Sequence, residues 1–154
     1  MHETTPPAPP SGTFQGPLHL FPVRVYYEDT DLSGIVYHAN YLRWFERARS
    51  DMLRLLGIDQ RAAAEAGEGT YTVADLSIRF LAPARLDDAV TIATQATEIR
   101  AASVRLQQKA TRAGEALAEA ELRVGFIAPD GRPRRQPAAW RAAFDTLQSA
   151  KAAA

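Results

Sequence analysis

Two carboxylates, a glycine and a histidine lie within ten residues of one another in the stretch YYEDTDLSGIVYHANYLRWFERAR, residues 26–49. Asp29 and Asp31 follow an alternating apolar run, and His38 stands where the pattern indicates the start of a helix. An aspartate is able to act as a base or a nucleophile, and free N–H groups at a helix N-terminus favour developing negative charge. Gly34 would let the loop between them approach a substrate closely. The stretch therefore supplies two groups that are able to flank a reacting carbonyl.

The same residue types also have structural uses, so the pattern by itself leaves the role of this stretch open. Aspartates in a loop before a helix often form turns or caps, and Asn40 fits a helix N-cap. A calcium loop is excluded, because the twelfth position counted from Asp29 is Asn40 rather than glutamate. His2, His19 and His38 show no metal-ligand spacing, so we predict neither a metal nor a cofactor.

A long helix is predicted directly after this stretch. Its apolar stripe recurs at helical spacing and consists of Tyr41, Phe45, Ala48, Met52 and Leu55. Arg47 and Asp51 fall on the opposite side of the helix, where they are spaced to pair across one turn. Gly57 is the predicted end of the helix.

The remaining elements are predicted to form one antiparallel sheet. Residues 1–17 are rich in proline and glycine, which predicts a disordered tail, and a first strand begins near Leu18. Four segments between residues 70 and 127 alternate apolar and polar side chains, as strands with one covered face do. About five strands and one apolar helix predict an α+β fold in which the sheet wraps the helix. Residues 18–136 would form this domain, and Pro137 would open a C-terminal helix within residues 137–154.

Composition limits the classes of partner. The 154 residues include 18 basic and 18 acidic side chains and no cysteine. This balance gives no overall attraction to nucleic acid, and the lack of cysteine excludes disulfides and thiolate catalysis. The N-terminus lacks the basic end and apolar run of a signal peptide, and no apolar stretch is long enough to span a bilayer. We therefore expect a cytoplasmic protein without stable membrane insertion.

Residues 26–49 resemble the motif of the hotdog-fold acyl-CoA thioesterases. The likeness is to the 4-hydroxybenzoyl-CoA thioesterase type and, within it, to the thioesterases associated with the Tol–Pal system. It is dense over residues 24–57, thinner through VADLSIRFLAPARLDDAVTI, and fades after about Arg100. The resemblance implies a hotdog fold and hydrolysis of a thioester to a free acid and CoA. It places the catalytic aspartate at Asp31 and the carbonyl-polarising backbone N–H at His38, and leaves Asp29 a structural role.

A thioester suits so small a set of groups. Its thiolate leaving group has a conjugate-acid pKa near ~8.5 if it resembles cysteine, so it departs without a dedicated general acid. Asp31 would activate water or attack the carbonyl directly, and the helix N-terminus would hold the oxyanion. The residues predicted to contact the substrate are neighbours of Asp31 and His38 in the sequence: Tyr27, Gly34, Val36, Tyr37 and Asn40. Trp44 and Phe45 fit an acyl pocket or the protein core equally well.

Other functions remain open to the sequence. One is a non-catalytic module that binds an acyl-CoA or an acyl carrier protein, although binding alone needs no carboxylate facing a thioester. Another is an interaction protein of the cell envelope. A hotdog dehydratase would place its acid on the central helix, where Glu46 is available. Neither the acyl chain nor the carrier, CoA or acyl carrier protein, is set by the sequence.

An open sheet edge predicts a homo-oligomer, either a dimer or a tetramer. The family normally joins two sheets edge to edge, and Asp31 is then expected to face residues 73–78 of a second copy. The polar face of the sheet is predicted to carry little charge and to suit close packing at Thr91, Ala93, Ser103 and Gln107.

Overall fold

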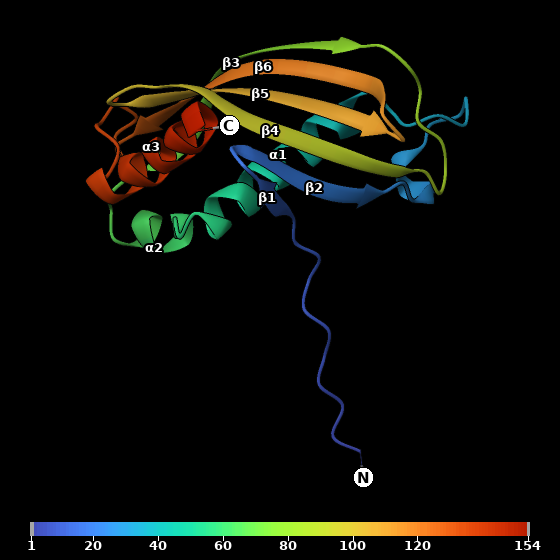
Figure 1. Ribbon diagram of the computed structural model, residues 1–154, viewed down its shortest axis with the longest axis horizontal. Coiled ribbons are helices and arrows are strands. Elements are labelled where there is room, and N and C mark those ends of the chain that lie inside the picture. Colours follow the sequence, from blue (N-terminus) through green and yellow to red (C-terminus); the bar gives the residue numbers. More distant parts are fainter. Residues whose placement is uncertain (1, 154) are drawn as a thin grey trace.

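The computed structural model describes residues 2–153, in which a six-stranded antiparallel sheet curves around one long helix, α1 (Ala39–Leu55) (Figure 1). The strands lie in the order β1-β2-β4-β5-β6-β3. Their bounds are Thr13–Gln15 for β1, Leu18–Arg24 for β2, Thr70–Phe80 for β3, Ala89–Ile99 for β4, Ser103–Arg112 for β5 and Glu115–Ile127 for β6. This is the predicted α+β arrangement, with one strand more than expected.

The helix α1 lies on the concave side of the sheet because one of its sides is almost wholly apolar. Burying each large apolar side chain contributes roughly 1.5–3 kcal/mol. Trp44 joins the core, whereas Leu55 lies in the last turn and is exposed. The other members of the predicted stripe are buried: Tyr41, Phe45, Ala48 and Met52. The helix ends where predicted, since Gly57 adopts a left-handed φ of 79° two residues after Leu55.

The strand β3 forms one edge of the sheet and is its most exposed long strand. It pairs with β6 from Thr70 to Phe80, and no other strand within residues 2–153 lies beyond it. Val73 and Phe80 are 44% and 48% exposed. The predicted alternation is present, but only Leu76 and Ile78 of its apolar face are half-buried.

The outer face of the sheet is charged, which corrects the expectation of little charge. Arg79 and Lys109 both contact Glu119, at 3.5 and 3.4 Å, and Arg123 contacts Asp75 at 3.1 Å. The charged residues lie on β3, β5 and β6. The uncharged residues lie on β4 and β5, and they are Thr91, Ala93, Ser103 and Gln107. Packing a second sheet tightly on this face would therefore require desolvating ion pairs.

The folded part begins earlier than the predicted Leu18. Residues 2–10 are exposed and form no helix or strand, but Thr13–Gln15 pairs with β2. We call residues 11–15 the N-terminal strap. Ser11 Oγ and Gly12 N donate hydrogen bonds of 2.7 and 2.9 Å to the carboxylate of Asp51, on α1.

Asp51 is buried, and its partners are Ser11, Gly12 and His19 rather than Arg47, so the expected pairing is wrong. Its Oδ2 lies 2.8 Å from Nε2 of His19, a β2 residue with no exposed surface. A buried carboxylate costs free energy unless it is hydrogen-bonded, and here the strap and His19 supply the bonds. Helical spacing alone did not reveal this partner, which lies 32 residues away in the chain.

Two shorter helices complete the fold, and the second begins where predicted. The helix α2 (Gln60–Glu65) comes soon after α1, and α3 (Ala138–Ala153) begins directly after Pro137. The helix α3 lies beneath one end of the sheet (Figure 1) and buries Trp140, Phe144 and Leu147. Within residues 2–153, no helix is both long and apolar enough to cross a membrane.

Candidate active site

The chain between β2 and α1 folds back on itself over residues 30–36. Thr30 forms an antiparallel bridge with Val36, and Asp31 N donates a 2.9 Å hydrogen bond to Ile35 O. The turn at the tip is closed by Gly34 N, which donates to Asp31 O at 3.0 Å. This pairing returns the chain toward Asp31 just before α1 begins. We call residues 30–38 the hairpin loop.

Asp31 carries an exposed carboxylate that is held in its charged form. Its Oδ1 accepts hydrogen bonds from Ser33 Oγ and from Ser33 N, the latter at 2.8 Å. The Ser33 bonds, followed by the Ile35 N–H and the nearby His38, lower the pKa of Asp31 below its ordinary 3.8. The carboxylate is therefore ionised at neutral pH. An acyl group bound over it would exclude water and raise its pKa, which strengthens it as a base.

Asp29 has a structural set of hydrogen bonds, as expected. It ends a short 3₁₀ turn, Tyr27–Asp29, and its Oδ2 accepts the Tyr26 N–H at 2.8 Å. Its carbonyl accepts the Tyr37 N–H at 2.9 Å and the side-chain amide of Asn40 at 2.8 Å. Asp29 thus fastens both ends of the hairpin loop to the start of α1.

Gly34 is required by the conformation of the turn. Its φ of 79° lies in the left-handed region, where side chains are disfavoured. A Cβ built at this position meets no atom within 4 Å. The turn conformation therefore explains the glycine, and its close approach to a substrate stays a prediction.

The start of α1 presents an unpaired hydrogen-bond donor. His38 is the N-cap residue, and its backbone N–H donates to no other residue in the range 2–153. The later N–H groups of Asn40 and Tyr41 bond to Tyr37 O and His38 O. A free N–H at the positive end of a helix dipole is suited to a carbonyl oxygen that gains negative charge.

An apolar groove of about 320 Å³ lies beside His38. The His38 ring is exposed and packs between Tyr37 and Phe80, at centroid distances of 4.6 and 5.9 Å. The groove is lined by Ile35, Val36, His38, Tyr41, Phe80, Leu81, Ala82 and Pro83. The part of the lining after β3 was not predicted, although the thinner stretch of family resemblance covers it.

Four of the five predicted substrate contacts lie outside this lining: Tyr27, Gly34, Tyr37 and Asn40. Val36 lines the groove, whereas Tyr27 projects from the 3₁₀ turn and is 84% exposed. Asn40 is buried and is the second residue of α1, so the N-cap interpretation is wrong. Its side chain donates to Asp29 O and accepts a 3.3 Å bond from Arg43. Trp44 and Phe45 belong to the core.

Glu46, the alternative acid, occupies a separate place on α1. Its Oε1 accepts a hydrogen bond from Ser50 at 2.8 Å. It lines a cavity of about 280 Å³ with residues of β3, β5, β6 and α3, and the lining includes neither Asp31 nor His38. This separation disfavours a dehydratase site built from Glu46 and His38 of the same chain. No cluster of three metal-ligating side chains occurs in the described part of the chain.

Comparison with known proteins gives the family. Residues 25–147 match the model of the thioesterase-like superfamily. The chain belongs to this superfamily. It is 42% identical over 122 residues to the acyl-CoA thioester hydrolase YbgC of Escherichia coli O6:H1 (strain CFT073), covering 78% of this chain and 90% of that one.

Two further comparisons support the assignment. The acyl-CoA thioesterase YbgC of Haemophilus influenzae is 40% identical over 107 residues, which cover 70% of this chain and 79% of the relative. The crystal structure of a probable thioesterase from Bartonella henselae superposes with a TM-score of 0.75 at 36% identity, covering 78% and 99% of the two chains. The predicted family, hotdog fold and enzyme class are thus confirmed.

Proposed function

We propose that this thioesterase hydrolyses acyl-CoA to a free acid and CoA, using the Asp31 carboxylate and the backbone N–H of His38. The observation that carries the proposal is the paired hairpin loop. It pairs the backbone of Asp31 with Ile35, and Ile35 and His38 both line the apolar groove. Asp31 supplies an ionised carboxylate, and His38 supplies an unpaired N–H at the start of the helix. The names of the curated relatives, acyl-CoA thioesterases and an acyl-CoA thioester hydrolase, support the substrate class.

The proposed reaction needs few groups. The thioester carbonyl oxygen accepts the His38 N–H at about 2.7–3.1 Å, and the adjacent acyl carbons lie in the groove. Asp31 either removes a proton from the attacking water or adds to the carbonyl to give a mixed anhydride that water then opens. The tetrahedral intermediate expels the CoA thiolate, which is protonated by Asp31 or by solvent.

The proposal is tested by replacing Asp31 with asparagine. Asp31→Asn keeps the shape of the side chain and removes the base, so turnover of a panel of aromatic, short and long acyl-CoAs should fall by at least ~10²-fold. Asp130→Asn is the matched control, because Asp130 is also exposed and its Oδ1 accepts the N–H two residues later. The control should keep full activity.

Two results would reject the assignment. Near-normal hydrolysis by Asp31→Asn would show that another group is the base. Tight acyl-CoA binding by the unmodified protein without any turnover would favour the non-catalytic binding module. Comparing hydrolysis of acyl-CoA with hydrolysis of acyl carrier protein thioesters then identifies the carrier of the acyl group. An acyl carrier protein partner and the cytoplasmic location both stay predictions.

We further propose that the protein is a homo-oligomer joined through β3. The free edge of this strand carries unpaired backbone groups and the exposed apolar side chains of Val73 and Phe80. Phe80 and Leu81 also line the groove beside His38, so a second copy on this edge would close the substrate site. The arrangement expected from the sequence, with Asp31 facing residues 73–78 of that copy, fits this proposal.

A further inference from the structure

The segment between β3 and β4, residues 81–88, forms one wall of the candidate active site. Leu81, Ala82 and Pro83 line the groove beside His38. The next residue, Ala84, is fully buried, and its carbonyl accepts the Val36 N–H at 2.9 Å. Arg85 forms an antiparallel bridge with Ile35. The position of the hairpin loop therefore depends on the position of the 81–88 segment.

Few apolar contacts hold the second half of this segment. Arg85, Leu86 and Asp87 are exposed, and Leu86 is 48% exposed despite its apolar side chain. Asp87 adopts a φ of 71°, a left-handed conformation that is unusual for a residue other than glycine. Hydrogen bonds rather than burial must therefore maintain this backbone.

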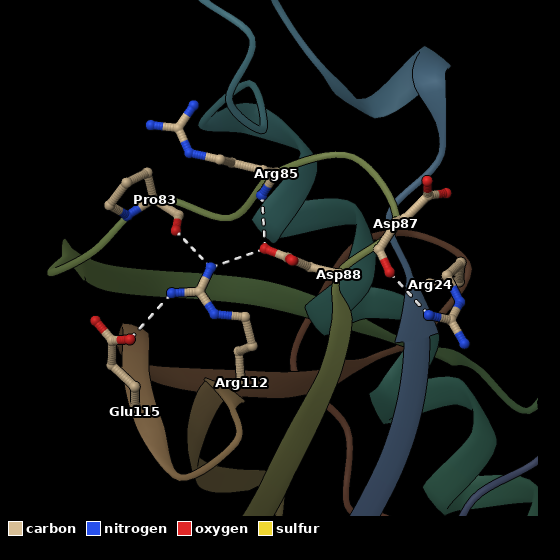
Figure 2. Close-up of polar contacts among 7 residues, drawn as sticks. All are labelled: Arg24, Pro83, Arg85, Asp87, Asp88, Arg112 and Glu115. Atoms are coloured by element: carbon tan, nitrogen blue, oxygen red, sulfur yellow. Dashed lines mark hydrogen bonds and ion pairs between the residues drawn. The ribbon is translucent and has the colours of Figure 1, made fainter.

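Arg112, the last residue of β5, provides bonds to both ends of the segment (Figure 2). Its Nη1 donates to Pro83 O at 3.0 Å and to the Asp88 carboxylate at 2.7 Å. The same Asp88 oxygen accepts the Arg85 N–H at 2.8 Å, which closes the turn of residues 85–88. Nη2 donates to Glu115 at 3.0 Å, which orients the guanidinium group.

The charges of this cluster are stable at neutral pH. The Arg85 N–H and then Arg112 lower the pKa of Asp88, and Asp88 and Glu115 raise the pKa of Arg112. The side chains of Arg112 and Asp88 are each only about a quarter exposed. A separate hydrogen bond, from Arg24 to Asp87 O at 2.8 Å, ties the segment to β2 (Figure 2).

We propose that Arg112 is a positioning residue for thioester hydrolysis. It holds Pro83 and Asp88 so that the groove wall and the Val36–Ala84 hydrogen bond stay in place, and it does not itself touch the substrate. The proposal rests on the proposed function of Asp31 and His38. Small displacements at reacting groups are costly, because a misplacement of about 1 Å can reduce turnover roughly 10²-fold.

The experiment compares Arg112→Gln, Arg112→Lys and Arg105→Gln. Arg105 lies on the same strand and contacts Glu98 at 3.4 Å on the outer face, so it is the matched ion-pair control. We expect Arg112→Gln to lower kcat/KM by about 10–100-fold and the control to change it less than about twofold. Arg112→Lys should fall between them, since an ammonium reaches Asp88 but lacks the fork that also holds Pro83 and Glu115.

A second readout does not use activity. Amide hydrogen exchange at Val36 reports the bond to Ala84 O directly. Exchange there should become at least about tenfold faster in Arg112→Gln, with exchange of the core helix amides unchanged. Asp31→Asn should leave Val36 exchange unchanged, so a failed catalytic assignment and a failed positioning role give different results.

The proposal is overturned if Arg112→Gln keeps kcat and KM within about twofold of the unmodified enzyme. It is also overturned if Val36 exchange is unchanged, or if all core amides exchange faster together, which would indicate general destabilisation. Should Arg112→Gln not fold, Asp88→Asn with Arg112→Lys tests the same bonds. Their effects on kcat/KM should then be less than additive, because both variants weaken one pair.

Discussion

The buried carboxylate of Asp51 allows a stability prediction that follows from the structure and not from the sequence pattern. Asp51→Ala removes three hydrogen bonds at once: those of 2.7 Å from Ser11, 2.9 Å from Gly12 and 2.8 Å with His19. It leaves the fully buried His19 without the partner of its Nε2, while its Nδ1 already has none within residues 2–153. The N-terminal strap loses its attachment to α1.

The size of the effect follows from these contacts. Leaving a buried donor such as His19 Nε2 without its partner costs about 1–3 kcal/mol, and each of the two part-buried hydrogen bonds from the strap contributes about 0.5–1.5 kcal/mol. Alanine has a higher helix propensity than aspartate, which returns up to about 0.7 kcal/mol. We therefore expect Asp51→Ala to lower the free energy of unfolding by about 3–4 kcal/mol. Asp51→Asn should cost less, about 1–2 kcal/mol, because its amide keeps one acceptor for Gly12 or His19 and donates to Ser11.

Urea denaturation at one fixed protein concentration measures the effect, because association would otherwise shift the midpoint. Glu65→Ala is the control, since the Arg61–Glu65 pair is an exposed helical pair and should contribute no more than about 0.5 kcal/mol. A loss below about 1 kcal/mol for Asp51→Ala would refute the reasoning.

The same cluster sets the sign of a pH effect. Burial lowers the pKa of His19 below 6.5, and the hydrogen bond and charge of Asp51 oppose this only in part. Burial raises the pKa of Asp51, but hydrogen bonds from Ser11, Gly12 and His19 outweigh it and lower the pKa below 3.8. In both cases the unfolded chain binds more protons. The stability is thus complete above pH 6.5 and falls as the pH decreases, by at most about 1.4 kcal/mol per pH unit for one proton. Denaturation at pH 7.5 and 5.5 tests this sign.

Two further predictions concern the site and the assembly. Ser33→Ala removes the main cause of the low pKa of Asp31, so the acid limb of the kcat/KM profile should move to higher pH; an unmoved limb would mean that Asp31 does not control it. Val73→Lys places a charge on the free edge of β3, so sedimentation at micromolar concentration should show a shift toward monomer with reduced activity. A fully active species with the mass of one chain would contradict the assembly proposal.

Local patterns predicted much of the fold. The central helix was evident because Tyr41, Phe45, Ala48 and Met52 repeat at the helical period and all are buried. The strands β3 to β6 were evident from alternation, since one face of each packs toward the helix. Asp31 and His38 were assigned by the family resemblance, because the local pattern left their roles open. Both lie on one short loop with its own backbone hydrogen bonds, and their catalytic roles stay predictions.

The residues that were missed have partners far away in the sequence. Asp51 falls opposite the apolar stripe, at a spacing that suits a pair with Arg47, and its partner His19 lies on another element. The N-terminal strap follows a proline-rich stretch, whose composition hid the bonds made by Ser11 and Gly12. Neither His19 nor the N-terminal strap leaves a periodic pattern in the sequence, because each of these contacts joins two single residues.

The candidate active site combines both kinds of information. The groups proposed to react lie within residues 31–38, so a short motif specifies them. The hairpin loop is braced by the 81–88 segment, and that segment is held by Arg112, which lies 81 residues after Asp31. An N–H at a helix start is common and stabilises an oxyanion only when the carbonyl is delivered to it at hydrogen-bond distance. The motif therefore identifies the chemistry, while the rate depends on contacts such as the Arg112–Asp88 pair that no motif contains.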